Sequence, residues 1–517
     1  MKKPSLLVIF LTIFIDLIGF GIVLPLLPRY SERFGAEGFM IGLIIASFSI
    51  MQFFFAPVWG RLSDRIGRRP VILISTAGSS ISYALFALAS APALSVAASL
   101  IILLSSRVFA GICGANISVA SAYMADVTPP EKRSKGMGLI GMAFGLGFIL
   151  GPVIGAVSYT HLGLAGPGWV ASAICTANFL LAAIVLAESR KPDSAPTTSR
   201  ATVAQWVHAL KTPTVGFLVT MYFLGTFAFA CFESTLPLLL GSPSFHPDDF
   251  AAPGALSRKV VTATDPVSAR VRSLLPADSL KAMGRADASE AALRREWFKA
   301  SEALLKSTVL FDANTWQQVN LRPETVKLST STQNSESLKR FNRLLLEDAY
   351  PAELKRQRFY FDERNIGYLF AFCGLMSALV QGGMIGRLVK AFGEPKLIWS
   401  SFVLVGVSLV IIPYAETLGV LLFGLALVSM ASGLNRAPTV GLISMHTSVA
   451  EQGAILGVTQ SAGTLGRIFG PLLATTAYKY LPHAPYLGAA ALCIMAGLFS
   501  MRKLRGVRGA KAETEAA

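Results

Sequence analysis

Gly60-Arg61-Leu62-Ser63-Asp64-Arg65-Ile66-Gly67-Arg68-Arg69-Pro70 is the stretch that decides the fold. Apolar runs flank it at 39–59 and 70–90, and each is long enough to cross a bilayer, which takes about 20 residues. A basic turn this short between two membrane-spanning segments is typical of the inner face of a membrane protein. Topology alone explains its arginines, but it explains neither Asp64 nor the glycines Gly60 and Gly67.

The composition indicates a membrane protein with many spanning segments. Of the 517 residues, 53% are hydrophobic and 15% are charged, whereas soluble domains carry about 25% charged residues. The formal net charge of +16 does not indicate nucleic-acid binding, because the lysines and arginines lie mainly in short loops and tails. The five cysteines fall in apolar runs without the spacing of a metal or redox site. We therefore expect no metal, no cofactor and no enzymatic activity.

Twelve apolar runs predict an all-α polytopic membrane protein with twelve transmembrane helices in two six-helix halves. The runs fall at 5–27, 39–59, 70–90, 94–125, 136–158, 167–187, 214–240, 365–386, 396–414, 417–445, 453–478 and 485–501. We assign 1–188 to the N-terminal half, 189–212 to a cytoplasmic linker and 213–517 to the C-terminal half, which contains a polar insert at 241–360. Basic residues gather in the loops after even-numbered helices, which places both termini in the cytoplasm.

The two halves repeat each other. Gly60-Arg61-Leu62 with Gly67 recurs as Gly386-Arg387-Leu388 with Gly393, and Gly138, Gly147 and Gly151-Pro152 in helix 5 recur as Gly457, Gly466 and Gly470-Pro471 in helix 11. Two six-helix halves related in this way are typical of transporters that rock around a central site.

These motifs carry a family resemblance. The stretch 60–70 resembles the signature of the major facilitator superfamily between helices 2 and 3, and Arg107 with Gly111 resembles its second motif. The glycines of helix 5 resemble the motif of proton-coupled antiporters, with Ala156 in place of the usual last glycine. Helix 1, with Asp16, resembles that of the drug:proton antiporters, including the tetracycline-resistance group. The resemblance implies the major facilitator fold and export in exchange for protons. The runs 365–386 and 396–414 lack the histidine and aspartate of the tetracycline pumps.

Three ionisable residues inside spanning segments are candidates for proton coupling: Asp16, Arg107 and Glu233. Charged groups are costly inside a bilayer, so each is a functional candidate. Helices 1 and 7 are equivalent in the repeat, so we expect Asp16 and Glu233 to face one cavity, where a proton and a cationic substrate compete. The resemblance implies that Arg107 acts on a carboxylate such as Asp16. The alternatives are a hydrogen-bonded structural aspartate and a structural ion pair.

A second group of residues is expected to form a latch on the inner side: Gly60, Asp64, Arg65, Gly67, Arg68 and Asp126. We expect Arg68 to pair with Asp126 at the end of helix 4. The family pattern implies that Asp64 meets the N-terminal end of helix 11, where the helix dipole is positive. The alternative is charge that only sets the topology, which leaves Asp64 unexplained.

Helix 5 and the cavity complete the predicted machinery. Gly138, Gly147, Gly151, Pro152 and Gly155 are expected to let helix 5 bend and pack closely, facing helix 8. Aromatic and amide side chains are expected to line the cavity in part, namely Phe20, Gln52, Asn116, Tyr222, Phe229 and Gln381. This mixture suits amphipathic, cationic aromatic compounds.

The insert at 241–360 departs from the family pattern, because a compact transporter needs only a short turn there. Helical periodicity occurs at 286–310 and again at 335–350. One interpretation is a tolerated insertion at an external loop tip, and the other is a helical cap that gates the opening or docks a partner.

Taken together, the sequence predicts a proton-coupled exporter of small amphipathic compounds in the cell (inner) membrane. We expect it to act as a monomer, with a small-molecule substrate, protons and the bilayer as partners and with no nucleic acid. A proton-coupled importer of a sugar or organic acid is the first alternative. The second is a transporter-like receptor that acts through its insert. Since no phosphate-binding loop of the Gly-rich, Lys-Ser/Thr type occurs, ATP-driven export is not expected.

Overall fold

The computed structural model describes residues 5–91, 94–128, 133–189, 203–241, 277–278, 281, 363–415, 417–448 and 451–505. Within these ranges the regular structure is helical throughout. The chain divides into two compact units, Met1–Leu240 with Glu363–Ala517, and Gly241–Asp362. The second unit contains the whole insert at 241–360, and the helices predicted at 286–310 and 335–350 lie outside the described residues.

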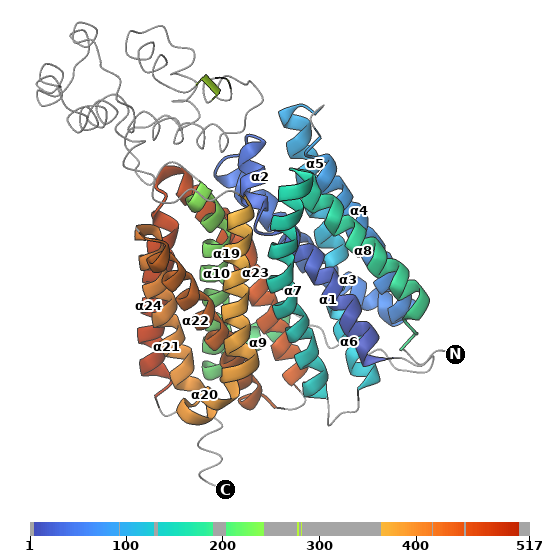
Figure 1. Ribbon diagram of the computed structural model, residues 1–517. Helices are drawn as coiled ribbons and strands as arrows, with labels where there is room; N and C mark the ends of the chain where they lie inside the picture. The colour runs from blue at the N-terminus through green and yellow to red at the C-terminus, as the bar shows by residue number, and fades with distance from the viewer. Residues whose placement is uncertain are drawn as a thin grey trace, which may run out of the picture. The chain divides into compact units, whose positions relative to one another are not determined.

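The first half is built from α1 (Leu6–Val23), the short α2 (Leu27–Arg33), α3 (Phe39–Ile66), α4 (Arg68–Leu88), α5 (Val96–Gly114), α6 (Ile117–Val127), α7 (Arg133–Leu162) and α8 (Gly166–Val185). The second half is built from α9 (Val203–Lys211), α10 (Pro213–Gly241), α19 (Glu363–Ala378), the π-helical η2 (Leu379–Met384), α20 (Ile385–Phe392), α21 (Glu394–Ile411), the 3-10 turn η3 (Ile412–Tyr414), α22 (Leu418–Met445), α23 (Gln452–Tyr480) and α24 (Ala484–Lys503). Figure 1 shows these helices running side by side.

The twelve predicted spans correspond to these helices, which confirms the twelve-helix fold. Helix 4 is divided into α5 and α6, and helix 8 runs through α19, η2 and α20. Among the described residues, eleven helices are long and apolar enough to cross a membrane by length and composition. The twelfth, α23, is not among the eleven; it is 29 residues long and carries polar side chains such as Gln460 and Arg467.

The predicted loop at 60–70 is shorter than expected. Helix α3 continues to Ile66, α4 begins at Arg68, and the reversal takes place at Gly67, whose φ is 101°. Gly393 makes the same turn in the second half with a φ of 79°. Residues other than glycine rarely adopt such angles, so both glycines are required by the backbone. The helix α9 inside the linker was not expected; it packs against α23.

The glycine pattern shared by helices 5 and 11 is a packing pattern. A Cβ atom on Gly151 would lie 2.6 Å from the Cα atom of Gly21, so α7 and α1 touch main chain to main chain. In the second half, a Cβ atom on Gly470 would lie 2.8 Å from the Cβ atom of Ala230 in α10. The repeated glycines therefore hold the fifth helix of each half against the first helix of the same half.

The helix pairs that join the two halves include α7 with α19 and α3 with α23. A Cβ atom on Gly374 would lie 2.8 Å from the carbonyl oxygen of Phe148, so helix 5 lies against helix 8. A Cβ atom on Gly42 would lie 2.8 Å from the Cα atom of Leu472. Nearby, Lys479 Nζ lies 3.0 Å from Glu37 Oε2. The halves are therefore closed at the end where α3 begins and α23 ends.

Candidate transport and gating sites

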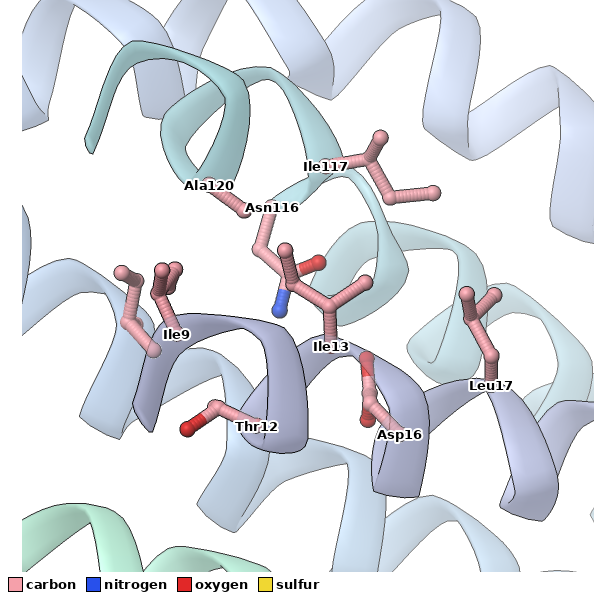
Figure 2. A pocket seen from close by; sticks show the side chains of 9 residues that line it. Ile9, Thr12, Ile13, Asp16, Leu17, Asn116, Ile117 and Ala120 are labelled. Carbon is pink, nitrogen blue, oxygen red and sulfur yellow. The ribbon is translucent and has the colours of Figure 1, made fainter. Parts of the chain in front are cut away.

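Asp16 lies in a small pocket inside the first half. The pocket is lined by α1, α4 and α6, through Ile9, Thr12, Ile13, Asp16, Leu17, Ile72, Asn116, Ile117 and Ala120. Figure 2 shows Asp16 and Asn116 reaching toward the space between α1 and α6. The side chains of Ser79 and Asn116 lie within hydrogen-bonding reach of the Asp16 carboxylate. Its Oδ1 atom has no hydrogen-bond partner among the described residues. A carboxylate in this apolar setting is suited to accept a proton.

Arg107 is almost fully buried, with 1% of its surface exposed. Its guanidinium carbon lies 5.7 Å from the centre of the Tyr83 ring, which is a cation–π arrangement. The charges of Arg107 and Asp16 both influence Tyr83. The action of Arg107 on a carboxylate such as Asp16, which the resemblance implied, stays a prediction.

Glu233 lies in a different pocket, which both halves line. Leu24, Pro28 and Ile45 come from the first half, and Ala230, Glu233, Ser234 and Pro471 come from the second. The positive charge of Arg467 acts on the Glu233 carboxylate. The pockets at Asp16 and at Glu233 have no residue in common. Asp16 turns toward α6 within its own half. One cavity shared by Asp16 and Glu233 stays a prediction.

The latch residues gather around Arg68. Its Nη1 atom lies 2.7 Å from Asp64 Oδ1, and its Nε atom lies 3.3 Å from Asp126 Oδ2. Arg68 also donates to Ser63 Oγ at 2.6 Å. Arg65 is exposed, and a Cβ atom on Gly60 would meet nothing within 4 Å.

Asp64 forms an ion pair with Arg68 inside its own half. The contact with the N-terminal end of helix 11 that the family pattern implied stays a prediction, because the hydrogen bonds and ion pairs of the described residues do not test it. The contact with helix 11 would lie at the end of the bundle opposite to the closed one. It therefore depends on the conformation, and Asp64 is held inside its own half here.

Glu188 belongs to the group of latch residues around Arg68, although its position at the start of the linker did not suggest this role. Its Oε1 atom accepts a hydrogen bond from the backbone N–H of Arg68 at 2.9 Å, and its Oε2 atom accepts one from Arg69 at 3.0 Å. The carboxylate thus caps the N-terminus of α4, where free N–H groups and the helix dipole favour a negative charge. A single acidic residue directly after the apolar run of helix 6 was the signal in the sequence.

We expect Glu188→Ala to lower the free energy of unfolding by about 1 kcal/mol, because two charge-assisted hydrogen bonds at a helix start are lost while the side chain is exposed. Thermal unfolding of the purified full chain measures this. Glu188→Gln keeps one acceptor oxygen, so its melting temperature should lie between those of the wild type and Glu188→Ala. Glu32→Ala removes an exposed carboxylate that pairs with Arg29 within one helix, and it should change the melting temperature less than Glu188→Ala does. Equal melting temperatures for Glu188→Ala and the wild type would contradict the capping role.

The predicted cavity residues are distributed over several sites. Asn116 lies beside Asp16, and the ring of Phe20 lies 4.9 Å from that of Phe48 and 6.0 Å from that of Phe148. Gln52 donates to the carbonyl oxygen of Gly114 at 3.1 Å.

In the second half, the ring of Phe229 lies 5.8 Å from that of Phe232, and Gln381 donates to Ser377 Oγ at 2.9 Å. Tyr222 contacts Arg436 and Gln460. A common cavity lined by these six residues stays a prediction.

Comparison with known proteins places this arrangement among transporters. The sequence model of the Major Facilitator Superfamily matches residues 9–261 and 345–517. The chain is 27% identical over 506 residues to major facilitator superfamily domain-containing protein 10 of Mus musculus. This alignment covers 92% of this chain and 88% of that protein. It is 36% identical over 233 residues to the class C tetracycline resistance protein of Escherichia coli, covering 43% of this chain and 56% of that protein.

Solved structures give the same fold. The human organic anion transporter MFSD10 (TETRAN) superposes with a TM-score of 0.55 at 23% identity, covering 96% of this chain and all of that one. A D-xylose-proton symporter superposes with a TM-score of 0.56 at 14% identity, covering 96% of each chain.

Proposed function

Because the chain belongs to the Major Facilitator Superfamily, it is a multi-pass membrane transporter, and we propose that it exports small amphipathic compounds in exchange for protons. Asp16 carries the proposal, since a carboxylate with an unpartnered oxygen lies among apolar side chains in helix 1. Such a group can bind a proton in one conformation and release it in another, where its surroundings differ. The close packing of α7 on α1 would pass a movement of helix 5 directly to this site.

The relatives suggest two classes of cargo. The tetracycline resistance protein of class C matches less than half of this chain, whereas the protein from Mus musculus matches nearly all of it. The human protein of the same name is an organic anion transporter. We therefore give organic anions more weight than tetracyclines as the substrate of this chain.

We further propose that the protein lies in the cell (inner) membrane with both termini in the cytoplasm, and that it acts as a monomer. This proposal includes the domain assignment: an N-terminal half at 1–188, a linker at 189–212 and a C-terminal half at 213–517. The basic loops after even-numbered helices support the orientation. The insert then lies on the external face. The alternative of a receptor that acts through the insert would be supported by a partner that binds it.

The proposal is tested by measuring proton release from the purified full chain when compounds are added. The panel consists of naphthalene derivatives that carry an ammonium, a hydroxymethyl or a sulfonate group. In liposomes, an imposed pH gradient should drive any compound that causes proton release across the membrane, against the concentration gradient of that compound. Exchange predicts proton release on binding and transport opposite to proton flow. Proton uptake on binding, with transport in the direction of proton flow, would instead support the importer. If no compound does either, proton exchange is wrong.

A further inference from the structure

Two arginines of the second half lie inside membrane-spanning helices and close to each other. Arg436 is in α22 and Arg467 is in α23, and the positive charge of Arg436 acts on Arg467. Arg436 Nε donates to the hydroxyl oxygen of Tyr222 in α10 at 3.2 Å, and Tyr222 in turn donates to Gln460 Oε1 at 3.3 Å. Three helices of one half therefore contribute to a single polar cluster.

This cluster lies deep in the membrane. Tyr222, Arg436 and Gln460 are each roughly nine residues from the end of their helix on the same side, which is about 13 Å at 1.5 Å per residue. The hydrocarbon core of a bilayer is about 30 Å thick, so they lie near its middle. Arg436 and Gln460 are nevertheless exposed. An arginine exposed to lipid at this depth would be strongly unfavourable, so these two side chains face an aqueous opening.

The charges of the cluster do not balance. Among the described residues, Glu233 supplies one negative charge near Arg467. The two guanidinium groups of Arg436 and Arg467 carry two positive charges. Arginine does not lose its proton in proteins, so the excess positive charge cannot be relieved by titration. Thr464 Oγ1, 3.2 Å from Arg467 Nη2, is a neutral partner. An anion placed between the arginines would compensate this excess positive charge.

We propose that Arg436 and Arg467, with Tyr222 and Gln460, form the binding site for the carboxylate or sulfonate group of an organic anion. The planar fork of a guanidinium group matches these two acceptors with paired hydrogen bonds. Tyr222 is held in place from behind, because a Cβ atom on Gly463 would lie 2.6 Å from its Cε1 atom. This inference rests on the proposed transport function and names the charge of its substrate.

The proposed site favours an anionic cargo, in contrast to the cationic cargo that the sequence suggested. A cationic compound would be repelled by the two arginines at the same depth, whereas Asp16 lies in a separate pocket of the other half. The proton site and the substrate site are then different places, one in each half. Coupling between them would proceed through the conformation of the bundle and not through competition at one carboxylate.

Equilibrium binding tests the site independently of transport. Naphthalene-2-sulfonate is titrated into the detergent-purified full chain by calorimetry, beside 2-naphthylmethylammonium as its cationic match. We expect the wild type to bind the sulfonate at least tenfold more tightly than the ammonium compound. Arg436→Gln and Arg467→Gln should each raise the Kd for the sulfonate at least tenfold, and Arg436→Lys should raise it less. Arg502→Gln, at the exposed end of α24, is the matched control and should bind as the wild type.

Gln460→Glu provides a second measurement that removes no arginine. The added negative charge beside Tyr222 should weaken sulfonate binding at least tenfold, while size-exclusion profiles report on folding. The proposal is overturned if the wild type binds the ammonium compound as tightly as the sulfonate, if it binds neither compound, or if Arg436→Gln and Gln460→Glu bind the sulfonate unchanged. Proton-coupled transport could still be observed in each of these cases, so the two proposals fail separately.

Discussion

Asp16→Asn is expected to abolish substrate-induced proton release and to lower the rate of proton-driven transport at least tenfold. Asparagine has nearly the same shape as aspartate and can keep the contacts with Ser79 and Asn116, but it has no titratable proton. A tenfold loss corresponds to about 1.4 kcal/mol in the free energy of the limiting step. The measurement is made in weakly buffered solution with a pH-sensitive dye and, in liposomes, with an imposed pH gradient.

The controls separate proton binding from damage to the fold. Asp16→Glu keeps a carboxyl group and should retain part of the proton release. Glu32→Gln changes a carboxylate that pairs with Arg29 far from the pocket, and should behave as the wild type. Substrate binding should persist in Asp16→Asn, because the proposed anion site lies in the other half. Should Asp16→Asn release as many protons as the wild type, Asp16 is not the proton carrier.

Gly151→Ala is expected to give the largest loss of stability among single methyl additions in α7. The new Cβ atom would lie 2.6 Å from the Cα atom and the carbonyl carbon of Gly21, both of which are main-chain atoms that cannot rotate away. Forcing extra atoms into a packed contact costs about 1–3 kcal/mol, and α1, which carries Asp16, would be displaced. We expect a lower melting temperature of the purified chain and a transport rate reduced at least tenfold.

Gly145→Ala is the matched control in the same helix. A Cβ atom at Gly145 would meet nothing within 4 Å, and alanine favours a helix over glycine by about 1 kcal/mol. This variant should be as stable as the wild type or more stable. Gly470→Ala, at the equivalent position in the second half, should resemble Gly151→Ala because it would meet Ala230 and the backbone of Phe227. Similar melting temperatures for Gly151→Ala and Gly145→Ala would show that the contact between α1 and α7 is not tight.

The sequence predicted the number and order of the helices well, because a bilayer imposes one simple requirement on every span. It also predicted that Gly67 and Gly393 are equivalent, and both do reverse the chain with a positive φ. Helix ends were less accurate, since α3 continues through residues whose charge suggested a loop. Charge marks the membrane boundary and does not stop a helix.

The side-chain partners were harder to predict, because the direction in which a helix turns its residues depends on tertiary packing. Asp16 and Glu233 occupy equivalent helices, yet they line different pockets. Asp64 pairs with Arg68, a partner that the family pattern did not point to. Glu188 and Arg436 found their partners through contacts across 120 and 214 positions of the chain, which no local pattern reveals.

The contact between α3 and α23 at Gly42 has a consequence for the energy stored across the membrane. Protons leak through proteins along files of water molecules, and such a file needs a continuous gap. Where the main chains of two helices touch, as they do at Gly42 and Leu472, no gap of that size remains. A side chain larger than glycine would push the two helices apart at this contact. We infer that Gly42 limits proton leak at this end when the halves are closed on it.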